Sequence, residues 1–420
     1  MPLLACLLLL VWTPLTAQVM KPKEVRELAK GGSDAIAQLV PLLKSPDINT
    51  RVEAVKAIVD IGTERSLTPL IEATRDSDAE MQIRAADGLV NFYLPGYVKT
   101  GLSAKLQRAG AAVKVKFTDV NDQVIDPYIQ TRADVIEALG KLARGGISME
   151  SRANAARAVG VLRGRAAIPD LLESMKSKDS AVLYESLVAF QKIGDRGTAI
   201  QIRYLLRDLD EKVQIAALET TGILQSQDSL TDLIEALNRT ESQKVRRAAL
   251  TAIAMIPKES SRLIYNRFLT DKDDAMRAAA AEGLGRLKDP ADRTALEKAY
   301  KEEGKALPRL SMAFALVATG QLDVSEFSPL QVLINTLNSK ARQNVAYALL
   351  VELARDPKVR APLYNAVSSG TKDEKIYLAR ILARSGDKDS LPSLEKVSHD
   401  TDADVAQEGV RALQNLRARL

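Results

Sequence analysis

The stretch Asp273-Asp-Ala-Met-Arg-Ala-Ala-Ala-Ala-Glu-Gly-Leu-Gly285 decides the fold of this chain. The Asp273 carboxylate can accept hydrogen bonds from the free N–H groups of a helix's first turn, so we expect a helix to begin beside it. Small and apolar residues follow at spacings of three and four, which places them on one face of that helix. Small side chains on this face would let a neighbouring helix approach closely.

The frame of this stretch recurs along the chain. We call its fourth residue, here Met276, the anchor, and we count frame positions from it. Anchors fall at Thr50, Met81, Ser151, Val182, Val213, Val245, Met276, Pro308, Ala341, Glu374 and Val405. Successive anchors stand 31–33 residues apart, except for one interval of 70 residues after Met81. A repeat of this length is typical of solenoids, in which each unit packs only on its neighbours.

Two further places in the frame have a nearly constant chemistry. The eighth position is small in almost every unit: Ala57, Gly88, Ala158, Ala189, Thr220, Ala252, Gly283, Ala315, Ala348, Ile381 and Ala412. Three residues before the anchors stand Asp47, Asp78, Ser148, Asp179, Asp210, Ser242, Asp273, Lys305, Asn338, Thr371 and Asp402. Ten of these eleven side chains can cap a helix, each stabilising it by roughly 1 kcal/mol. We therefore expect the second helix of each unit to start near this place.

Another amphipathic stretch precedes each cap, and a proline enters it at Pro69, Pro169 and Pro392. Proline suits the first turn of a helix, where its missing N–H costs nothing. The helix ends before these entries are marked by Gly62, Gly164 and Gly386. Each unit is thus a helix, a short turn and a helix. We predict an all-α fold, an α-α superhelix of about eleven helix pairs forming a curved rod with one irregular insertion.

The pattern Asp-x-x-Val/Met-Arg-x-x-Ala-x-x-Ala-Leu/Ile-Gly resembles the HEAT-like repeats of the phycobilisome-lyase type. It is clearest at 273–285 and recurs with changes at 47–62, and the resemblance covers about residues 33–418 apart from the insertion. It implies an α-solenoid. It implies no single activity, because members of this group range from chromophore lyases to interaction scaffolds.

The N-terminus indicates export. An apolar run from Leu3 to Trp12 is followed by Pro14 and by small residues ending at Ala17, as in a signal peptide, although no Lys or Arg precedes the run. We expect cleavage after residue 17, with an uncleaved anchor as the alternative. Cys6 is the only cysteine, so the mature chain would have neither a disulfide nor a thiolate metal site. This favours a periplasmic or extracellular protein, in a bacterial setting, without a transmembrane span in its mature chain.

The long interval holds an insertion at residues 94–130, between repeats at 18–93 and at 131–420. We expect a short helix and a β-hairpin in it. Its aromatic and basic residues make it a candidate for partner binding, since long insertions in regular arrays are often functional. The candidate residues are Tyr97, Lys99, Lys105, Arg108, Lys114, Lys116 and Tyr128. The alternative is a structural patch that covers exposed core between two half-solenoids.

Frame position seven points away from the core positions. If the second helices line the concave face, as in HEAT-like solenoids, the last four residues of this row become candidates for binding. They are Phe314, Tyr347, Arg380 and Arg411, two aromatic and two arginine side chains of the kinds favoured at interfaces. The alternative is that Phe314 and Tyr347 fill an irregularity of the core.

The sequence offers little chemistry for catalysis. His399 is the only histidine, and we find neither a phosphate-binding loop nor a nucleophile elbow, so we expect no enzyme, no metal site and no cofactor. The charged side chains are nearly balanced, 59 basic against 54 acidic with a net charge of +5, which argues against nucleic acid as the partner. We expect a scaffold that binds a protein or peptide partner outside the cytoplasm. The alternatives are a lyase-type chromophore-attachment factor and a binder of an anionic polymer or membrane surface.

Overall fold

The computed structural model describes residues 20–97 and 123–420, and every regular element within these ranges is a helix. Ten of the eleven anchors lie in a second helix, as predicted, and the eleventh, Ala341, precedes one. The second helices are α3 (Ile48–Ile61), α5 (Ala79–Tyr93), α9 (Met149–Val161), α11 (Ser180–Ile193), α12 (Glu211–Ile223), α14 (Gln243–Ala254), α16 (Asp274–Leu287), α18 (Ala306–Ala318), α20 (Gln343–Leu353), α22 (Lys372–Ser385) and α24 (Ala403–Arg417). All but α20 begin two residues before their anchor, so the sequence frame is the structural frame.

The first helices of the units are shorter and often open with a turn of 3₁₀-helix. They are η1 (Gly32–Ala35), α2 (Ile36–Leu39) and η2 (Val40–Lys44), then α4 (Glu64–Ala73), α8 (Ala133–Gly145), η3 (Arg165–Ala167) with α10 (Ile168–Ser174), and η4 (Arg196–Arg207). The later ones are η5 (Gln227–Ser229) with α13 (Leu230–Arg239), η6 (Glu259–Ser261) with α15 (Arg262–Phe268), η7 (Pro290–Asp292) with α17 (Arg293–Glu302), α19 (Pro329–Thr336), α21 (Pro357–Ser369), and η8 (Lys388–Ser390) with α23 (Leu391–Val397). An additional helix, α1 (Pro22–Ala29), packs on α3 at the N-terminus.

Most of the predicted caps are present. The side chains that accept a hydrogen bond from the first turn of their helix are Asp47, Asp78, Ser148, Asp179, Asp210, Ser242, Asp273, Thr371 and Asp402. The prediction is wrong at Asn338, because its amide group donates to Glu374 Oε1 (2.7 Å), and α20 begins only after Arg342. The expected place of Pro69 is also wrong, because α4 begins at Glu64 and the proline lies inside the helix.

The small residues of the frame are where neighbouring second helices meet. A Cβ atom added at Gly160, Gly222 or Gly285, all at position ten, would lie 2.7 Å from a backbone Cα of the next second helix. Those Cα atoms belong to Ala189, Ala252 and Ala315, which all occupy position eight. Glycine opposite alanine therefore sets the closest approach between helices of consecutive units.

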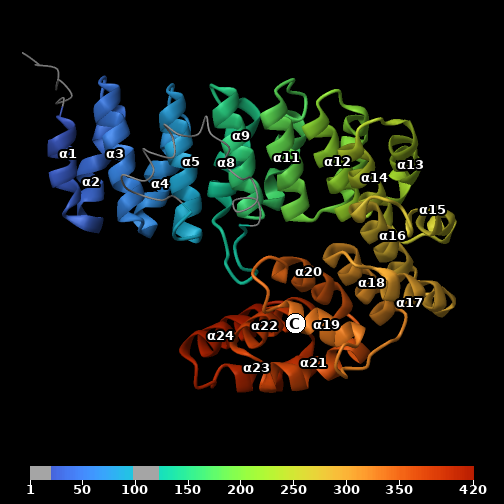
Figure 1. The fold of residues 1–420 in the computed structure, drawn as a ribbon. Helices are drawn as coiled ribbons and strands as arrows, with labels where there is room; N and C mark the ends of the chain where they lie inside the picture. The colour runs from blue at the N-terminus through green and yellow to red at the C-terminus, as the bar shows by residue number, and fades with distance from the viewer. Residues whose placement is uncertain (1–19, 98–122) are drawn as a thin grey trace, which may run out of the picture.

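The stack does not run as the simple curved rod that we expected. Figure 1 shows an N-terminal arm, α1 to α14, a turn formed by α15 to α18, and a C-terminal arm, α19 to α24, that folds back beneath the first. Consecutive second helices pack on one another throughout, including α5 on α9 across the long interval. On the inner side of the turn, Arg286 of α16 reaches past α18 to Glu352 of α20. The second helices therefore line the concave surface, and in the described ranges none of the helices is long and apolar enough to cross a membrane.

Candidate partner-binding surface

The two arms meet at the strap, by which we mean residues 123–132 between the long interval and α8. Ile125 anchors the strap, because its side chain is buried and its N–H donates to the Val161 carbonyl at the end of α9 (3.0 Å). Asp126 then faces α24 of the opposite arm. Arg411 Nε donates to Asp126 Oδ2 (2.9 Å), Arg411 Nη2 lies 2.8 Å from the same oxygen, and the Asn415 amide donates to Oδ1 at 3.4 Å. These contacts join residues that are 285 and 289 positions apart.

Arg411 was a candidate from frame position seven, and Tyr128 was a candidate from the insertion. The structure brings the two together, because Tyr128 lies close enough to influence the charge of Arg411 and is 41% exposed. The hydrogen bond to Asp126 is the main reason why the pKa of Arg411 is raised. One inner surface therefore carries candidates from both ends of the chain.

Tyr347 and Arg380 lie beside this contact, on the concave face of the C-terminal arm. The Tyr347 ring packs edge-to-face on Tyr377, with 5.9 Å between the ring centres. The Arg384 guanidinium lies 5.7 Å from the Tyr347 ring, and the Arg380 guanidinium lies 5.3 Å from the Tyr377 ring. Both distances suit cation–π contacts. Burial raises the pKa of the Tyr347 hydroxyl.

Sequence reasoning missed Tyr377 and Arg384, although a signal for both was present. They occupy frame positions four and eleven of α22, three residues before and four residues after Arg380 at position seven. Residues at these spacings lie on one helix face, so the row at position seven has neighbours on both sides. The sequence prediction considered only position seven of each unit, and it therefore did not include Tyr377 or Arg384.

The candidate set also contained Phe314, and that prediction is wrong. Its side chain is 1% exposed and therefore unavailable to a partner. The reason is Gly285 of the preceding second helix, where an added Cβ would lie 3.0 Å from Phe314 Cε1. The phenyl ring packs over the surface that the glycine leaves bare, and the Arg286 guanidinium covers it at 5.3 Å.

Arg163 approaches from the N-terminal arm. It follows α9 with a left-handed backbone (φ 50°), and its side chain is exposed. Burial lowers the pKa of Arg163, and the positive charge of Arg384 lowers it further, while Asp126 opposes both effects. Arg163 at the end of α9 and Arg411 of α24 therefore lie near one aspartate of the strap, and Arg384 of α22 lies near Arg163.

Tyr97 occupies a different place, on the concave surface of the N-terminal arm. Burial raises the pKa of Tyr97, and the carboxylate of Asp87 raises it further. Arg157, beside it, forms two hydrogen bonds with the buried Glu185, at 2.6 Å and 3.1 Å. Tyr97 thus belongs to a paired network that is separate from Tyr128. The candidates Lys99, Lys105, Arg108, Lys114 and Lys116 lie outside the described residues.

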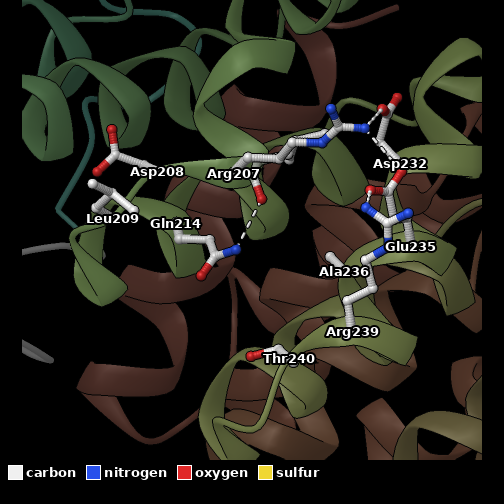
Figure 2. Close-up of a pocket in the computed structure, with 10 residues that line it drawn as sticks. Arg207, Asp208, Leu209, Gln214, Asp232, Glu235, Ala236, Arg239 and Thr240 are labelled. Atoms are coloured by element: carbon white, nitrogen blue, oxygen red, sulfur yellow. Dashed lines mark hydrogen bonds and ion pairs between the residues drawn. The ribbon is translucent and has the colours of Figure 1, made fainter.

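The outer layer carries two shallow hollows, on either side of η4. Figure 2 shows the first, of about 420 Å³, between η4 and α13. Arg207 lies 2.8 Å from Glu235 in this hollow, and the Gln214 amide donates to the Leu206 carbonyl (2.9 Å). The second, of about 670 Å³, lies between α10 and η4 beside Tyr204. Most of the charged side chains labelled in the first hollow form ion pairs with one another, so their role there is structural.

The remaining polar groups suggest structure more than catalysis. His399 Nδ1 lies 2.8 Å from the Glu395 carbonyl at the end of α23. Three carboxylates of the concave face hold basic partners: Glu185 pairs with Arg157, Glu282 with Arg286 and Glu408 with Arg380. Residues 20–97 and 123–420 contain no group of His, Cys, Asp and Glu side chains arranged to hold a metal ion.

A family model described as HEAT repeats matches residues 24–90 and 230–317. Among solved structures, a chain in the complex of CpcE and CpcF of phycocyanin lyase from Nostoc sp. is 16% identical in sequence to this protein. The match covers 64% of this chain and 92% of that chain, with a TM-score of 0.39. The structure of an engineered protein is 20% identical, and the match covers 91% of this chain and 98% of that chain with a TM-score of 0.39. Importin beta is 14% identical, with 96% and 64% covered and a TM-score of 0.37. No curated protein matches the sequence.

Proposed function

We propose that this HEAT-repeat solenoid is a non-enzymatic scaffold that binds a protein partner outside the cytoplasm through the concave surface of its C-terminal arm. The observation that carries the proposal is the surface formed by Tyr347, Tyr377 and Arg384, which we call the Tyr/Arg surface. Aromatic and arginine side chains are the residues that most often supply binding energy at protein interfaces. Here they lie on helices of the solenoid, so binding a partner costs little conformational entropy of the backbone.

The absence of an enzyme activity is part of the proposal. It is supported by three carboxylates of the concave face that are engaged in ion pairs: Glu185 and Glu408 pair with arginines of an adjacent unit, and Glu282 pairs with Arg286 of its own helix. It is also supported by the only histidine, which is engaged with a main-chain carbonyl at a helix end. His399 Nδ1 also lies 3.2 Å from Ser398 Oγ, but a ring nitrogen that donates to the Glu395 carbonyl carries a proton and cannot act as a base towards that hydroxyl.

The location outside the cytoplasm rests on residues 1–17. If they are removed on export, the mature chain begins at Gln18 and contains no tryptophan, because Trp12 is the only one. Mass spectrometry of the protein from the exported fraction should give this N-terminus. Indole fluorescence from that same fraction would show that the segment is retained and would argue for an anchored protein instead.

Site-specific photo-cross-linking tests the binding surface. We would replace Tyr347 by p-benzoylphenylalanine in cells that make the protein naturally, and use Tyr204 as the matched control. Tyr204 is a tyrosine on the outer layer and is 58% exposed. We expect one discrete adduct from position 347, which mass spectrometry can identify, and none from position 204. Adducts from position 204 alone would move the interface to the convex side and contradict the proposal.

A further inference from the structure

The surface where the arms meet carries more positive than negative charge. Among the described residues it brings together four arginines, Arg163, Arg380, Arg384 and Arg411, and two carboxylates, Asp126 and Glu408. Glu408 is committed to Arg380 (2.7 Å), and Asp126 is committed to Arg411 (2.8 Å). Within residues 20–97 and 123–420, the guanidinium groups of Arg163 and Arg384 have no carboxylate at ion-pair distance.

These two guanidinium groups are close enough to repel each other. Like charges held together destabilise the closed arrangement, and an incoming anion would relieve that repulsion. Arginine is suited to carboxylates because its planar fork can donate two parallel hydrogen bonds. The neighbouring rings of Tyr347 and Tyr377 would contact the apolar parts of a peptide.

The structure already contains one carboxylate bound to an arginine of this surface. Asp126 Oδ2 accepts a hydrogen bond from Arg411 Nε and lies 2.8 Å from Arg411 Nη2, and Asp126 lies on a strap that is anchored through Ile125 instead of lying within a helix. The Arg411 side chain is 49% exposed, so solvent and a partner can both reach it. Asp126 thus behaves as an internal ligand that an external carboxylate can replace.

We propose that Arg163, Arg384 and Arg411 form a docking site for an acidic segment of the partner protein, and that Asp126 occupies one carboxylate position until that segment displaces it. This inference rests on the proposed function, since it names the chemistry of the partner that the concave surface binds. Without its partner, the protein would keep Asp126 paired with Arg411. Binding would replace an intramolecular ion pair by an intermolecular one.

Fluorescence anisotropy with a labelled octaglutamate peptide tests the site directly. We expect salt-sensitive binding to the purified protein, because the contacts are between exposed charges. The double variant Arg163→Glu with Arg384→Glu should weaken binding at least about tenfold. The matched control is Arg65→Glu with Arg239→Glu, which makes the same change of charge at side chains that are 69% and 78% exposed elsewhere.

The role of Asp126 is tested by Asp126→Asn, which should tighten octaglutamate binding about three- to fivefold by removing the competitor. Its control is Asp34→Asn, which changes the net charge equally at a side chain that is 93% exposed. Circular dichroism establishes that each variant is folded. Equal effects in the variants and in their controls would mean that only net charge matters, and would overturn the inference.

Other anions separate the possible partners. A thymidine oligonucleotide or vesicles of equal parts phosphatidylcholine and phosphatidylserine would overturn the inference if either bound more tightly than octaglutamate. The scaffold function is judged independently. An adduct from position 347 together with no binding of octaglutamate would show that the partner exists but is not acidic here. Octaglutamate binding without an adduct would leave the docking chemistry in place and count against the scaffold role of the Tyr/Arg surface.

Discussion

The interface of α16 with α18 and the interface of α18 with α20 join helices of the same kind, yet different side chains separate them. In the first, Gly285 at position ten faces Ala315 at position eight, and the helices approach as closely as two backbones allow. In the second, position ten of α18 holds Val317, and the buried residues of α20 are Ala346, Leu349, Leu350 and Leu353, so more side-chain volume lies between the helices. The stack changes direction at these interfaces, and the C-terminal arm runs back beneath the N-terminal arm (Figure 1).

This difference indicates what sets the path of the solenoid. The repeat frame determines where most second helices begin, but the side-chain volume at positions eight and ten determines the distance and angle between consecutive second helices. Elsewhere the same two positions exchange roles: at α3 and α5, Val59 fills position ten and Gly88 leaves position eight empty. Small differences in side-chain volume at successive interfaces each change the angle between neighbouring helices, and their sum determines the shape of the whole molecule.

The largest expected effect follows from overfilling the tight interface. Gly285→Leu should destabilise the protein by about 3 kcal/mol, because its Cβ would already lie 2.7 Å from the Ala315 Cα, which cannot move independently of α18. Chemical denaturation measures this effect. Gly145→Ala is the control, since nothing lies within 4 Å of an added Cβ there. If both substitutions leave the unfolding midpoint unchanged, close helix approach does not determine the stack.

A smaller effect is expected where the turn is held together by charge. The Arg286 side chain is 9% exposed and donates to both Glu352 oxygens at 2.8 Å and to Glu282 at 3.1 Å. Arg286→Met should cost about 2 kcal/mol, less than for fully buried pairs because both glutamates are partly solvated. It should also increase the radius of gyration measured by X-ray scattering. Arg239→Met, at a side chain that is 78% exposed, should change stability by less than about 0.5 kcal/mol and leave the radius unchanged.

The aspartate caps of the second helices should make the stability of the protein depend on pH, and Asp273, the cap of α16, is the clearest case. The hydrogen bond from Arg247 is the main cause that lowers the pKa of Asp273, to about 2 from an ordinary 3.8. A lowered pKa in the folded state means that the stabilisation is complete above about pH 4 and is lost as the pH falls towards 2.

Asp273→Asn isolates this contribution, because asparagine can still cap the helix but cannot form the ion pair. The difference in unfolding free energy between this variant and the unaltered protein should be about 1 kcal/mol at pH 6 and should vanish near pH 2. Asp179→Asn is the matched control, since Asp179 caps α11 through the same kind of main-chain bonds without an ion pair among the described contacts. A difference that persists at pH 2 would mean that the charge of Asp273 is not its cause.

The local features of the fold could be predicted from the sequence because they depend on neighbours along the chain. A capping side chain and the residues that follow it determine where a helix starts, which is why Asp47 and Asp402 were placed correctly. The prediction failed at Asn338, whose amide instead bonds to Glu374 of the next unit. A residue of the capping type is not a cap when a partner from another unit competes for its side chain.

The candidate site could be predicted only in part, because it depends on contacts between units. Burial of Phe314 follows from the glycine at 285 in the preceding second helix, which no reading of its own unit reveals. The contact of Asp126 with Arg411 depends on the summed geometry of all the interfaces between α9 and α24. A sequence pattern shows which face is exposed, but it does not show which exposed faces meet.

The smallest expected effect concerns the contact between the arms, and it separates two explanations of the fold-back. If the interfaces set the path, the pair of Asp126 and Arg411 only narrows the motion of arms that already lie close. Because the Arg411 side chain is 49% exposed, the pair should contribute about 0.5 kcal/mol of coupling in a double-mutant cycle of Asp126→Ala and Arg411→Ala.

The distance between the arms gives the decisive measurement. Cys6 is the only cysteine, so a Cys6→Ser background allows two nitroxide labels to be placed at Lys141 of α8 and Arg417 of α24, both exposed. In Arg411→Ala the distribution of label distances should broaden around an unchanged mean. The exchange of Asp126→Arg with Arg411→Asp should narrow it again, because the same two charges then face each other in reverse. A mean distance that shifts outward in Arg411→Ala would show that the ion pair, and not the packing at positions eight and ten, folds the arms together.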